Sequence, residues 1–181
     1  MPRMRLSPSL RKSIFAALLA LSALGARAQT QAPEPDLKAA IITNMLLFVE
    51  WPARSNFPAD RLRICHQGEG PVAKALAQLD GKTVRNKVVK VLAINSGNVS
   101  ECQALYISPG GIATFHKTIG MVGSSPVLIA SDSPEYFQHG AMLNLELVAG
   151  RIVFDVDLRA AQRVGLLISS KALRMARQVA E

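Results

Sequence analysis

The sequence of 181 residues has few of the residue types from which metal sites and nucleophilic active sites are commonly built. It contains three histidines and two cysteines, and none of them stands in a CxxC or HxxxH spacing that would bring two metal ligands together. The GxSxG motif, which holds a nucleophilic serine on a sharp turn, is also absent. These absences argue against zinc sites and serine hydrolases of the kinds that short motifs define. An active site could then only be assembled from residues of distant loops.

A hydrophobic run long enough to cross a bilayer is absent as well. The apolar run near the N-terminus, residues 13–25, is shorter than the roughly 20 residues that a spanning helix needs. It follows basic residues and precedes Ala26-Arg27-Ala28, so residues 1–28 have the three parts of a secretory signal peptide. We predict cleavage after Ala28 and export to the periplasm. No cysteine stands directly after the cleavage site, so a lipoprotein is not expected.

Without residues 1–28, the sequence has no strong excess of positive or negative charge. Five of the 21 basic residues and none of the 13 acidic residues lie in residues 1–28, so the formal net charge falls from +8 to about +3. Nucleic-acid binding therefore loses its main support, and no nucleic-acid partner is expected. The mature chain has the size of one domain, without internal repeats.

The only cysteines, Cys65 and Cys102, both belong to the part expected to be exported. In an oxidising compartment two cysteines in a small domain are most simply explained by one disulfide, and the alternative is a pair of buried free thiols. A bridge between them would stabilise the fold by about 3–4 kcal/mol in the chain-entropy model.

Residues 37–52 form the longest apolar run after the signal segment, behind a flexible lead-in of residues 29–36. The run predicts one helix, capped by Asp36 and ended at Glu50 or Trp51 because Pro52 cannot continue it. Its apolar residues cover most of the circumference, so we expect a central helix that is buried on more than one side.

Strand and helix patterns then alternate along the chain. Strands are predicted at 62–66, 83–94, 104–107 and 126–130, and helices at 72–79, 112–119 and 135–138. Residues 88–94 are apolar enough to be buried on both faces. A hairpin is predicted from 142–147 and 152–156, followed by helices at 158–164 and 166–179. The fold class is therefore a single α/β domain, residues 37–181, with a mostly parallel central sheet flanked by helices, a C-terminal antiparallel hairpin at one edge and a terminal helix.

The loop of residues 108–111, Ser108-Pro109-Gly110-Gly111, lies between a predicted strand and a helix N-terminus. Such a loop can hold an anion on its backbone N–H groups. It lacks the lysine and the spacing of a phosphate-binding loop, so an ordinary turn is the favoured interpretation.

The remaining titratable residues do not form a recognisable active site. His66, His116 and His139 are far apart in sequence and are interpreted as solvated. Glu146, Asp155 and Asp157 lie on the predicted hairpin, where we expect solvated carboxylates that protect an exposed edge strand. We therefore predict no catalytic residues, no metal site and no cofactor.

Two stretches of the sequence carry a resemblance to a known family. Residues 37–52, with Lys38-Ala39-Ala40, Asn44 and the closing FVEWP, resemble the opening helix of the YfiR family of exported bacterial proteins. Residues 140–157 (GAMLNLELVAGRIVFDVD), with Ala160-Ala161 and LISSKAL at 167–173, resemble its closing hairpin and helix. Asp157 stands where an asparagine is usual, and Cys65 with Cys102 would match one of the two disulfides found in some members.

The resemblance implies a regulator without catalytic activity. Proteins of this family lie in the periplasm, bind the periplasmic sensor portion of a membrane diguanylate cyclase and inhibit it. An outer-membrane lipoprotein can sequester the inhibitor, and cyclic di-GMP then rises in the cytoplasm. Family members can also associate as dimers.

Two other functions stay open beside the inhibitor. An α/β layout with loops at the strand ends also suits a periplasmic small-ligand sensor or carrier acting with a sensor kinase or transporter. A hydrolase with a site built from distant loops is the third. A disulfide between Cys65 and Cys102 also suggests that reduction destabilises the inhibitor and relieves repression.

Overall fold

The architecture is taken from a computed structural model that describes residues 32–94 and 99–181. The predicted signal peptide, its cleavage site after Ala28 and the first residues of the lead-in lie outside the described residues. The described part from Ala32 to Glu181 forms one compact unit.

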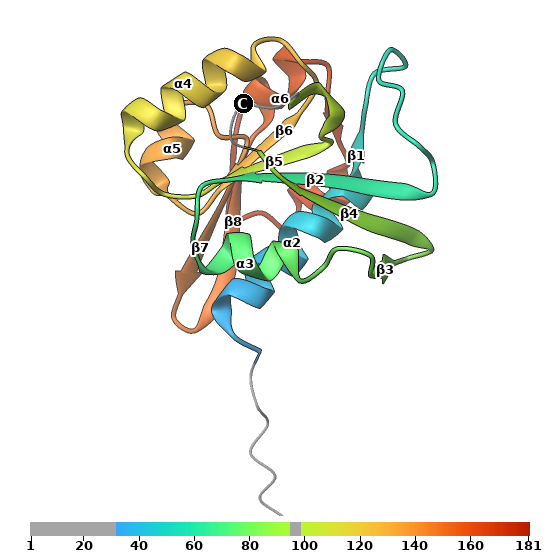
Figure 1. The fold of residues 1–181 in the computed structure, drawn as a ribbon. Coiled ribbons are helices and arrows are strands. Elements are labelled where there is room, and N and C mark those ends of the chain that lie inside the picture. Colours follow the sequence, from blue (N-terminus) through green and yellow to red (C-terminus); the bar gives the residue numbers. More distant parts are fainter. Residues whose placement is uncertain (1–31, 95–98) are drawn as a thin grey trace, which may run out of the picture. The chain divides into compact units, whose positions relative to one another are not determined.

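A mostly parallel sheet of eight strands forms the centre of this unit (Figure 1). Its strand order is β10-β8-β7-β6-β5-β2-β4-β3. The strands are β2 (Arg61–Gln67), β3 (Thr83–Val84), β4 (Lys87–Ala93), β5 (Ala104–Ile107), β6 (Leu128–Ser131), β7 (Leu143–Val148), β8 (Arg151–Asp157) and β10 (Gln178–Ala180). Within this eight-stranded sheet, as far as the structure describes it, only the pairs β3–β4 and β7–β8 are antiparallel. The predicted fold class is confirmed.

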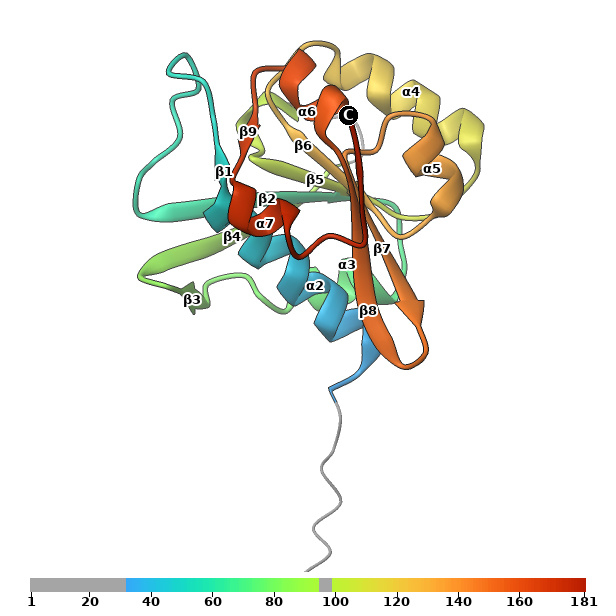
Figure 2. The ribbon, with the colours of Figure 1, turned by 180° about the vertical axis from the view of Figure 1, so that it is seen from behind.

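Helices cover both faces of the sheet. They are α2 (Glu34–Met45), α3 (Pro71–Ala77), α4 (Ile112–Val122), α5 (Pro134–Gln138), α6 (Leu158–Arg163) and α7 (Ser170–Leu173), with short 3-10 turns η1 (Leu46–Phe48) and η2 (Val99–Glu101). Figures 1 and 2 show α2 and α3 on one face and α4 and α5 on the other. Every residue of β5 and β6 is buried between these layers, as expected for central parallel strands.

The central helix is shorter than the sequence predicts. It ends at Met45 and passes through η1 into β1 (Val49–Glu50), which pairs antiparallel with β9 (Leu167–Ile168). Pairing with a strand more than a hundred residues later satisfies the backbone groups that a longer helix would have used. Asp36 is not the cap either, because the helix begins after Pro33 and Asp36 lies in its first turn.

The predicted helix over 166–179 is wrong. This stretch contains β9, the four-residue helix α7 and the strand β10, which runs parallel to β8. The Ser169 hydroxyl accepts a hydrogen bond from the Ala172 amide and starts α7, and serine favours this capping position over a helix interior. β10 covers β8 from Asp155 to Asp157, so the hairpin is not the edge of the sheet there.

The prediction that residues 88–94 are buried on both faces is also wrong. In β4 only Val89 is buried, and Val88 is 42% exposed. The strand lies next to the end of the sheet, where its outer neighbour β3 has only two residues. A turn at Arg85 and Asn86, both with positive φ, separates the two strands.

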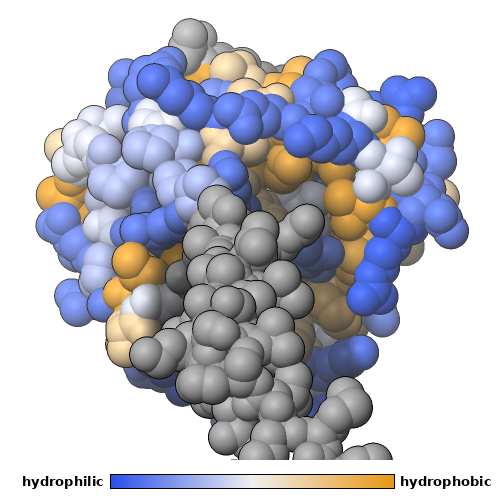
Figure 3. Space-filling view, turned by 90° about the horizontal axis from the view of Figure 1, so that it is seen from below, coloured by the Kyte–Doolittle hydropathy of each residue, from blue (hydrophilic) through white to orange (hydrophobic). Residues whose placement is uncertain are grey.

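Among residues 32–94 and 99–181, large apolar side chains at the surface are few and spread over several elements. They are Val88, Met121, Leu147, Val148, Leu167 and Met175. Figure 3 shows one face, on which hydrophobic areas are interrupted by hydrophilic side chains. Scattered apolar residues of this kind are normal for a protein surface and do not mark one binding patch.

Candidate functional site

The chain order reverses between β2 and β5, which are neighbours in the sheet. The chain continues from β2 to β4 on one side, and from β5 to β6 and β7 on the other. These strands are parallel to one another, so their carboxyl ends lie at the same edge of the sheet. In open α/β sheets this reversal is where ligands commonly bind.

A cavity of about 320 Å³ lies at this edge. Residues 69–72 after β2, Ser108 and Pro109 after β5, and Asp132 after β6 contribute to its lining. The first turns of α2 supply Glu34, Pro35 and Lys38. The polar groups therefore come from the carboxyl-terminal half of β5 (Tyr106), from the segments after β2, β5 and β6, and from the start of α2.

Lys38, Asp132 and Tyr106 form a connected polar cluster in the cavity wall. The Lys38 Nζ donates to Asp132 Oδ2 at 3.0 Å and pairs with Glu34 Oε1 at 2.7 Å. The Tyr106 hydroxyl donates to Asp132 Oδ1 at 2.7 Å. The Lys38 and Asp132 side chains are only 8% and 14% exposed, so the pair is largely removed from water.

Lys38 and Tyr106 hold their protons more tightly than usual in this cluster. Burial lowers the pKa of Lys38, but hydrogen bonds to Glu34 and Asp132 outweigh it and hold the pKa above its ordinary value. Burial and the neighbouring Asp132 carboxylate raise the pKa of Tyr106. A lysine that stays charged and a phenol that stays neutral cannot accept protons at pH 7. Lys38 and Tyr106 can therefore bind and orient a group, but neither acts as a base at neutral pH.

Ser108 is the polar group in this wall whose hydrogen-bonding capacity is unfilled. It is 7% exposed and its hydroxyl makes no well-formed hydrogen bond, although it lies close to Tyr106. The turn after β2 passes directly behind it, and a Cβ added at Gly68 would lie 3.1 Å from the Ser108 Cβ. A buried hydroxyl without a well-formed hydrogen bond is uncommon and marks a place where a ligand atom or water can bind.

The loop of residues 108–111 is held by Tyr136 of α5. The Gly110 amide donates to the Tyr136 hydroxyl at 2.9 Å, and that hydroxyl donates to the Gly111 carbonyl at 3.1 Å. The Tyr136 ring stacks on Phe115 of α4 at 4.3 Å. One of the amides that an anion would have needed is therefore already used, which supports the interpretation as an ordinary turn.

The structure brings together two of the three histidines that the sequence left apart. His116 on α4 and His139 after α5 are exposed, and their ring centroids lie 4.9 Å apart in a perpendicular arrangement. His66 at the end of β2 is half-buried and has an Nδ1 atom without a hydrogen bond. Within residues 32–94 and 99–181, no three side chains of His, Cys, Asp or Glu meet in a way that could hold a metal ion.

The prediction that the hairpin carboxylates are solvated is wrong for Asp155. Asp155 is 4% exposed and accepts hydrogen bonds from Arg177, from Nε at 2.9 Å and from a terminal nitrogen. Arg177 also pairs with Glu146 at 2.7 Å, and hydrogen bonds to both carboxylates raise the pKa of Arg177. Asp157 caps α6 by accepting from the Ala160 amide at 2.8 Å. These carboxylates have structural partners because β10 and α6 pack against the hairpin.

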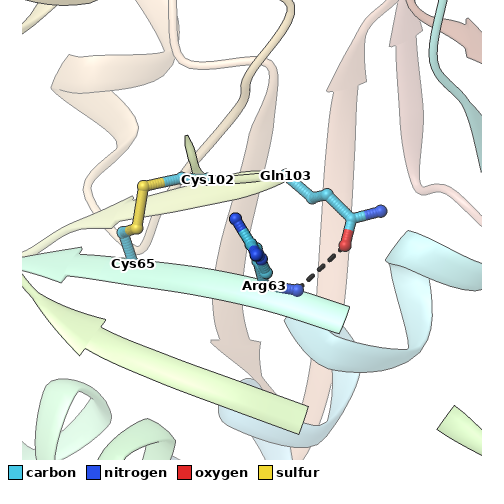
Figure 4. The surroundings of a disulfide bond; sticks show 4 residues. All are labelled: Arg63, Cys65, Cys102 and Gln103. Atoms are coloured by element: carbon cyan, nitrogen blue, oxygen red, sulfur yellow. Dashed lines mark hydrogen bonds between the residues drawn. A yellow bond between two sulfur atoms is a disulfide. The ribbon is translucent and has the colours of Figure 1, made fainter. Parts of the chain in front are cut away.

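A disulfide joins Cys65 of β2 to Cys102, just before the neighbouring strand β5 (Figure 4). The two Cα atoms are 5.7 Å apart and both residues are fully buried. Next to the bridge the Gln103 side chain accepts a hydrogen bond from the Arg63 amide at 2.9 Å. The bridge therefore fastens two strands on either side of the chain reversal.

Sequence reasoning missed the Lys38–Asp132–Tyr106 cluster. Two signals could have indicated it: a lysine within an apolar helix that was expected to be central, and the polar residues Ser108 and Asp132 directly after buried strands. Polar groups at such strand ends converge because the strands are parallel.

Comparison with known proteins defines the fold and the family. No curated protein sequence matches the chain. The ABC domain in complex with L-Trp from Streptococcus pneumonia superimposes with a TM-score of 0.52 at 13% identity, over 80% of this chain and 60% of that chain. A conserved domain protein from Vibrio cholerae superimposes with a TM-score of 0.55 at 10% identity, over 81% and 60%. The chain thus spans less than two thirds of either structure, and likeness at this identity shows the fold alone.

No helix in residues 32–94 or 99–181 has the length and apolar character that crossing a membrane requires. The sequence profile of one family matches residues 35–177, which is most of the chain and includes every element from α2 to β9. The chain belongs to the YfiR/HmsC-like family.

Proposed function

We propose that this protein binds the periplasmic sensor portion of an inner-membrane diguanylate cyclase and represses it, so that cyclic di-GMP falls. The observation that carries the proposal is the family match over residues 35–177. The cavity cluster agrees with a binding role, because Lys38 and Tyr106 are held in protonation states that cannot accept a proton at neutral pH. We therefore propose a regulator and not an enzyme.

Repression requires that the protein binds the inactive cyclase more tightly than the active one. A ligand with equal affinity for both states shifts neither population, however tightly it binds. A preference of about tenfold corresponds to about 1.4 kcal/mol of coupling free energy. An outer-membrane lipoprotein that competes for the same inhibitor would relieve repression by mass action, and we include such a partner in the proposal.

The test combines a physical and a cellular measurement. The processed protein is expressed in the periplasm with an affinity tag and co-purified with a membrane cyclase that carries a periplasmic sensor and a GGDEF domain. Cyclic di-GMP is then measured before and after deletion of this gene and after its return. Co-purification and a rise on deletion are expected. Unchanged cyclic di-GMP under all growth conditions tested would contradict the inhibitor function.

The contact surface can be mapped from the exposed apolar side chains. We expect Leu167, 59% exposed on β9, and Met175, 54% exposed after α7, to be the most informative positions. Leu167→Ser and Met175→Ser should leave the melting temperature nearly unchanged, because solvated side chains contribute little to stability. Val88→Ser on β4 is the matched control on another element. The same variants, in light scattering, test whether copies of this chain associate as dimers.

A periplasmic small-ligand sensor or carrier is the second candidate. The cavity of about 320 Å³ at the chain reversal favours it, because ligand sites of α/β sheets lie there. Neighbouring genes offer a first discrimination: a gene for a sensor kinase or transporter favours this candidate, and a gene for a sensor-linked cyclase favours repression.

A further inference from the structure

We propose that the cavity between α2, α3 and the ends of β5 and β6 binds a small organic cation that carries a primary ammonium group on a short apolar chain. This inference deepens the small-ligand candidate above and rests on it. It does not depend on the identity of any protein partner.

The charges in the cavity wall favour a cation. Three carboxylate side chains, Glu34, Glu69 and Asp132, stand against the single ammonium group of Lys38. Lys38 is already paired with two of these carboxylates, at 2.7 and 3.0 Å. Carboxylates therefore outnumber ammonium groups by two, and an anionic ligand would be repelled where a cationic one is attracted.

The unfilled hydrogen-bonding capacity also points to an N–H donor. The Tyr106 hydroxyl gives its hydrogen to Asp132, so its oxygen can only accept a further bond. The buried Ser108 hydroxyl has no well-formed hydrogen bond and can accept as well. An ammonium group has three donors and no acceptor, so it can satisfy Ser108 and a carboxylate at the same time.

The rest of the wall limits what is attached to the ammonium group. Pro35, Pro71, Pro109 and Val72 contribute apolar surface. A volume of about 320 Å³ is at the lower end of the range for small-molecule sites, roughly 300–1,000 Å³. A short alkyl chain would contact these prolines and the valine, whereas a bulky or highly polar ligand such as a nucleotide would not fit the space or the charge.

The experiment titrates the whole protein without residues 1–28 with n-butylammonium chloride and, separately, with sodium butyrate. The two probes share a carbon chain and differ in the charge of the head group. Backbone amide chemical shifts in two-dimensional NMR report where each probe binds. We expect saturable shifts with butylammonium at Gly70, Val72, Ser108 and Asp132, and none with butyrate.

Two variants remove the groups that would hold the cation. Ser108→Ala removes the unpaired hydroxyl, and Glu34→Gln removes one charge at a side chain that is 40% exposed. Each should weaken butylammonium binding about tenfold, as expected for one hydrogen bond to a charged group. Glu101→Gln is the matched control, because Glu101 lines a different cavity, and it should not change the affinity.

Three results would overturn the proposal. They are the absence of saturable shifts with butylammonium, equal binding of butyrate, or unchanged affinity in folded Ser108→Ala and Glu34→Gln proteins. The cyclase experiment has a separate readout, cyclic di-GMP and co-purification, so failure of repression and failure of the cation site can be told apart.

Discussion

Lys38 and Asp132 are 94 positions apart in the chain, and their side chains form a largely buried ion pair with 3.0 Å between Nζ and Oδ2. Lys38 belongs to the first helix of the described fold, and Asp132 follows the central strand β6. The pair fastens α2 to the carboxyl edge of the sheet. Stability, the cavity and its charge therefore depend on the same contact.

Removing one member of this pair should destabilise the protein strongly. Lys38→Met leaves the Asp132 carboxylate largely buried without its counter-ion, for which we expect a loss of about 3 kcal/mol in the free energy of unfolding. Chemical denaturation measures the loss. In the double variant Lys38→Met/Asp132→Asn the cost should be smaller than the sum of the two single costs. Additive costs would show that the two side chains are not coupled.

The same cluster predicts loss of stability at alkaline pH. The pKa values of Lys38 and Tyr106 are raised in the folded protein above the ordinary 10.5 and 10.0. Above about pH 10 the unfolded chain therefore loses these protons first, so the free energy of unfolding decreases as pH rises. Denaturation between pH 8 and 11 should show this decrease, and it should be weaker in Tyr106→Phe. Equal slopes in the two proteins would contradict the assignment to Tyr106.

Reduction of the disulfide should lower the melting temperature. Cys65 and Cys102 are 37 positions apart in the chain. Breaking the bond between them is expected to lower the free energy of unfolding by about 3–4 kcal/mol. Thermal melting with and without reductant measures this change, with the Cys65→Ser/Cys102→Ser protein as the control that reductant cannot affect. If the midpoint of the unsubstituted protein does not move, reduction cannot be the signal that relieves repression.

Arg177 should hold the C-terminal strand against the hairpin. In Arg177→Met the Asp155 carboxylate, 4% exposed, loses its charged partner, so we expect a lower melting temperature and faster hydrogen exchange in β10 and β8. Arg174→Met, at an exposed arginine three positions earlier, is the control. Similar exchange rates in both variants would mean that backbone pairing alone retains β10.

A side chain at Gly68, close to Ser108, should destabilise the protein. Gly68 has a φ of +82° and its added Cβ would lie 3.1 Å from the Ser108 Cβ, whereas Gly81 has a φ of +76° and open space around it. Gly68→Ala should lower the free energy of unfolding more than Gly81→Ala does. The second substitution has only the conformational penalty of about 1 kcal/mol. The difference in unfolding free energy isolates the contact with Ser108, and equal costs would disprove close packing there.

Local patterns were sufficient to predict most of the sheet. Residues 104–107 and 126–130 are short and apolar, and they became the fully buried strands β5 and β6. The hairpin was predictable because Gly150, between two strand-like runs, readily adopts the positive φ that such a turn requires, and the structure shows a positive φ there and at Ala149. The YfiR-like signatures in residues 37–52 and 140–173 were confirmed by the family match over residues 35–177.

Predictions failed where a residue's conformation depends on a distant partner. Val49 and Glu50 leave the helix to pair with Ile168 and Leu167, and residues 178–180 become a strand because β8 has an unpaired edge there. Neither conformation can be predicted from neighbouring residues alone, since the stabilising hydrogen bonds come from strands that are distant in the sequence.

The sequence by itself determined the α/β alternation, the family and the lack of a motif-defined active site, because these depend on composition and local periodicity. Only the tertiary structure decided that Lys38, Tyr106, Ser108 and Asp132 share one cavity wall. Parallel strands deliver their carboxyl ends to a common edge, so residues from separate parts of the chain meet there at distances that sequence spacing does not encode.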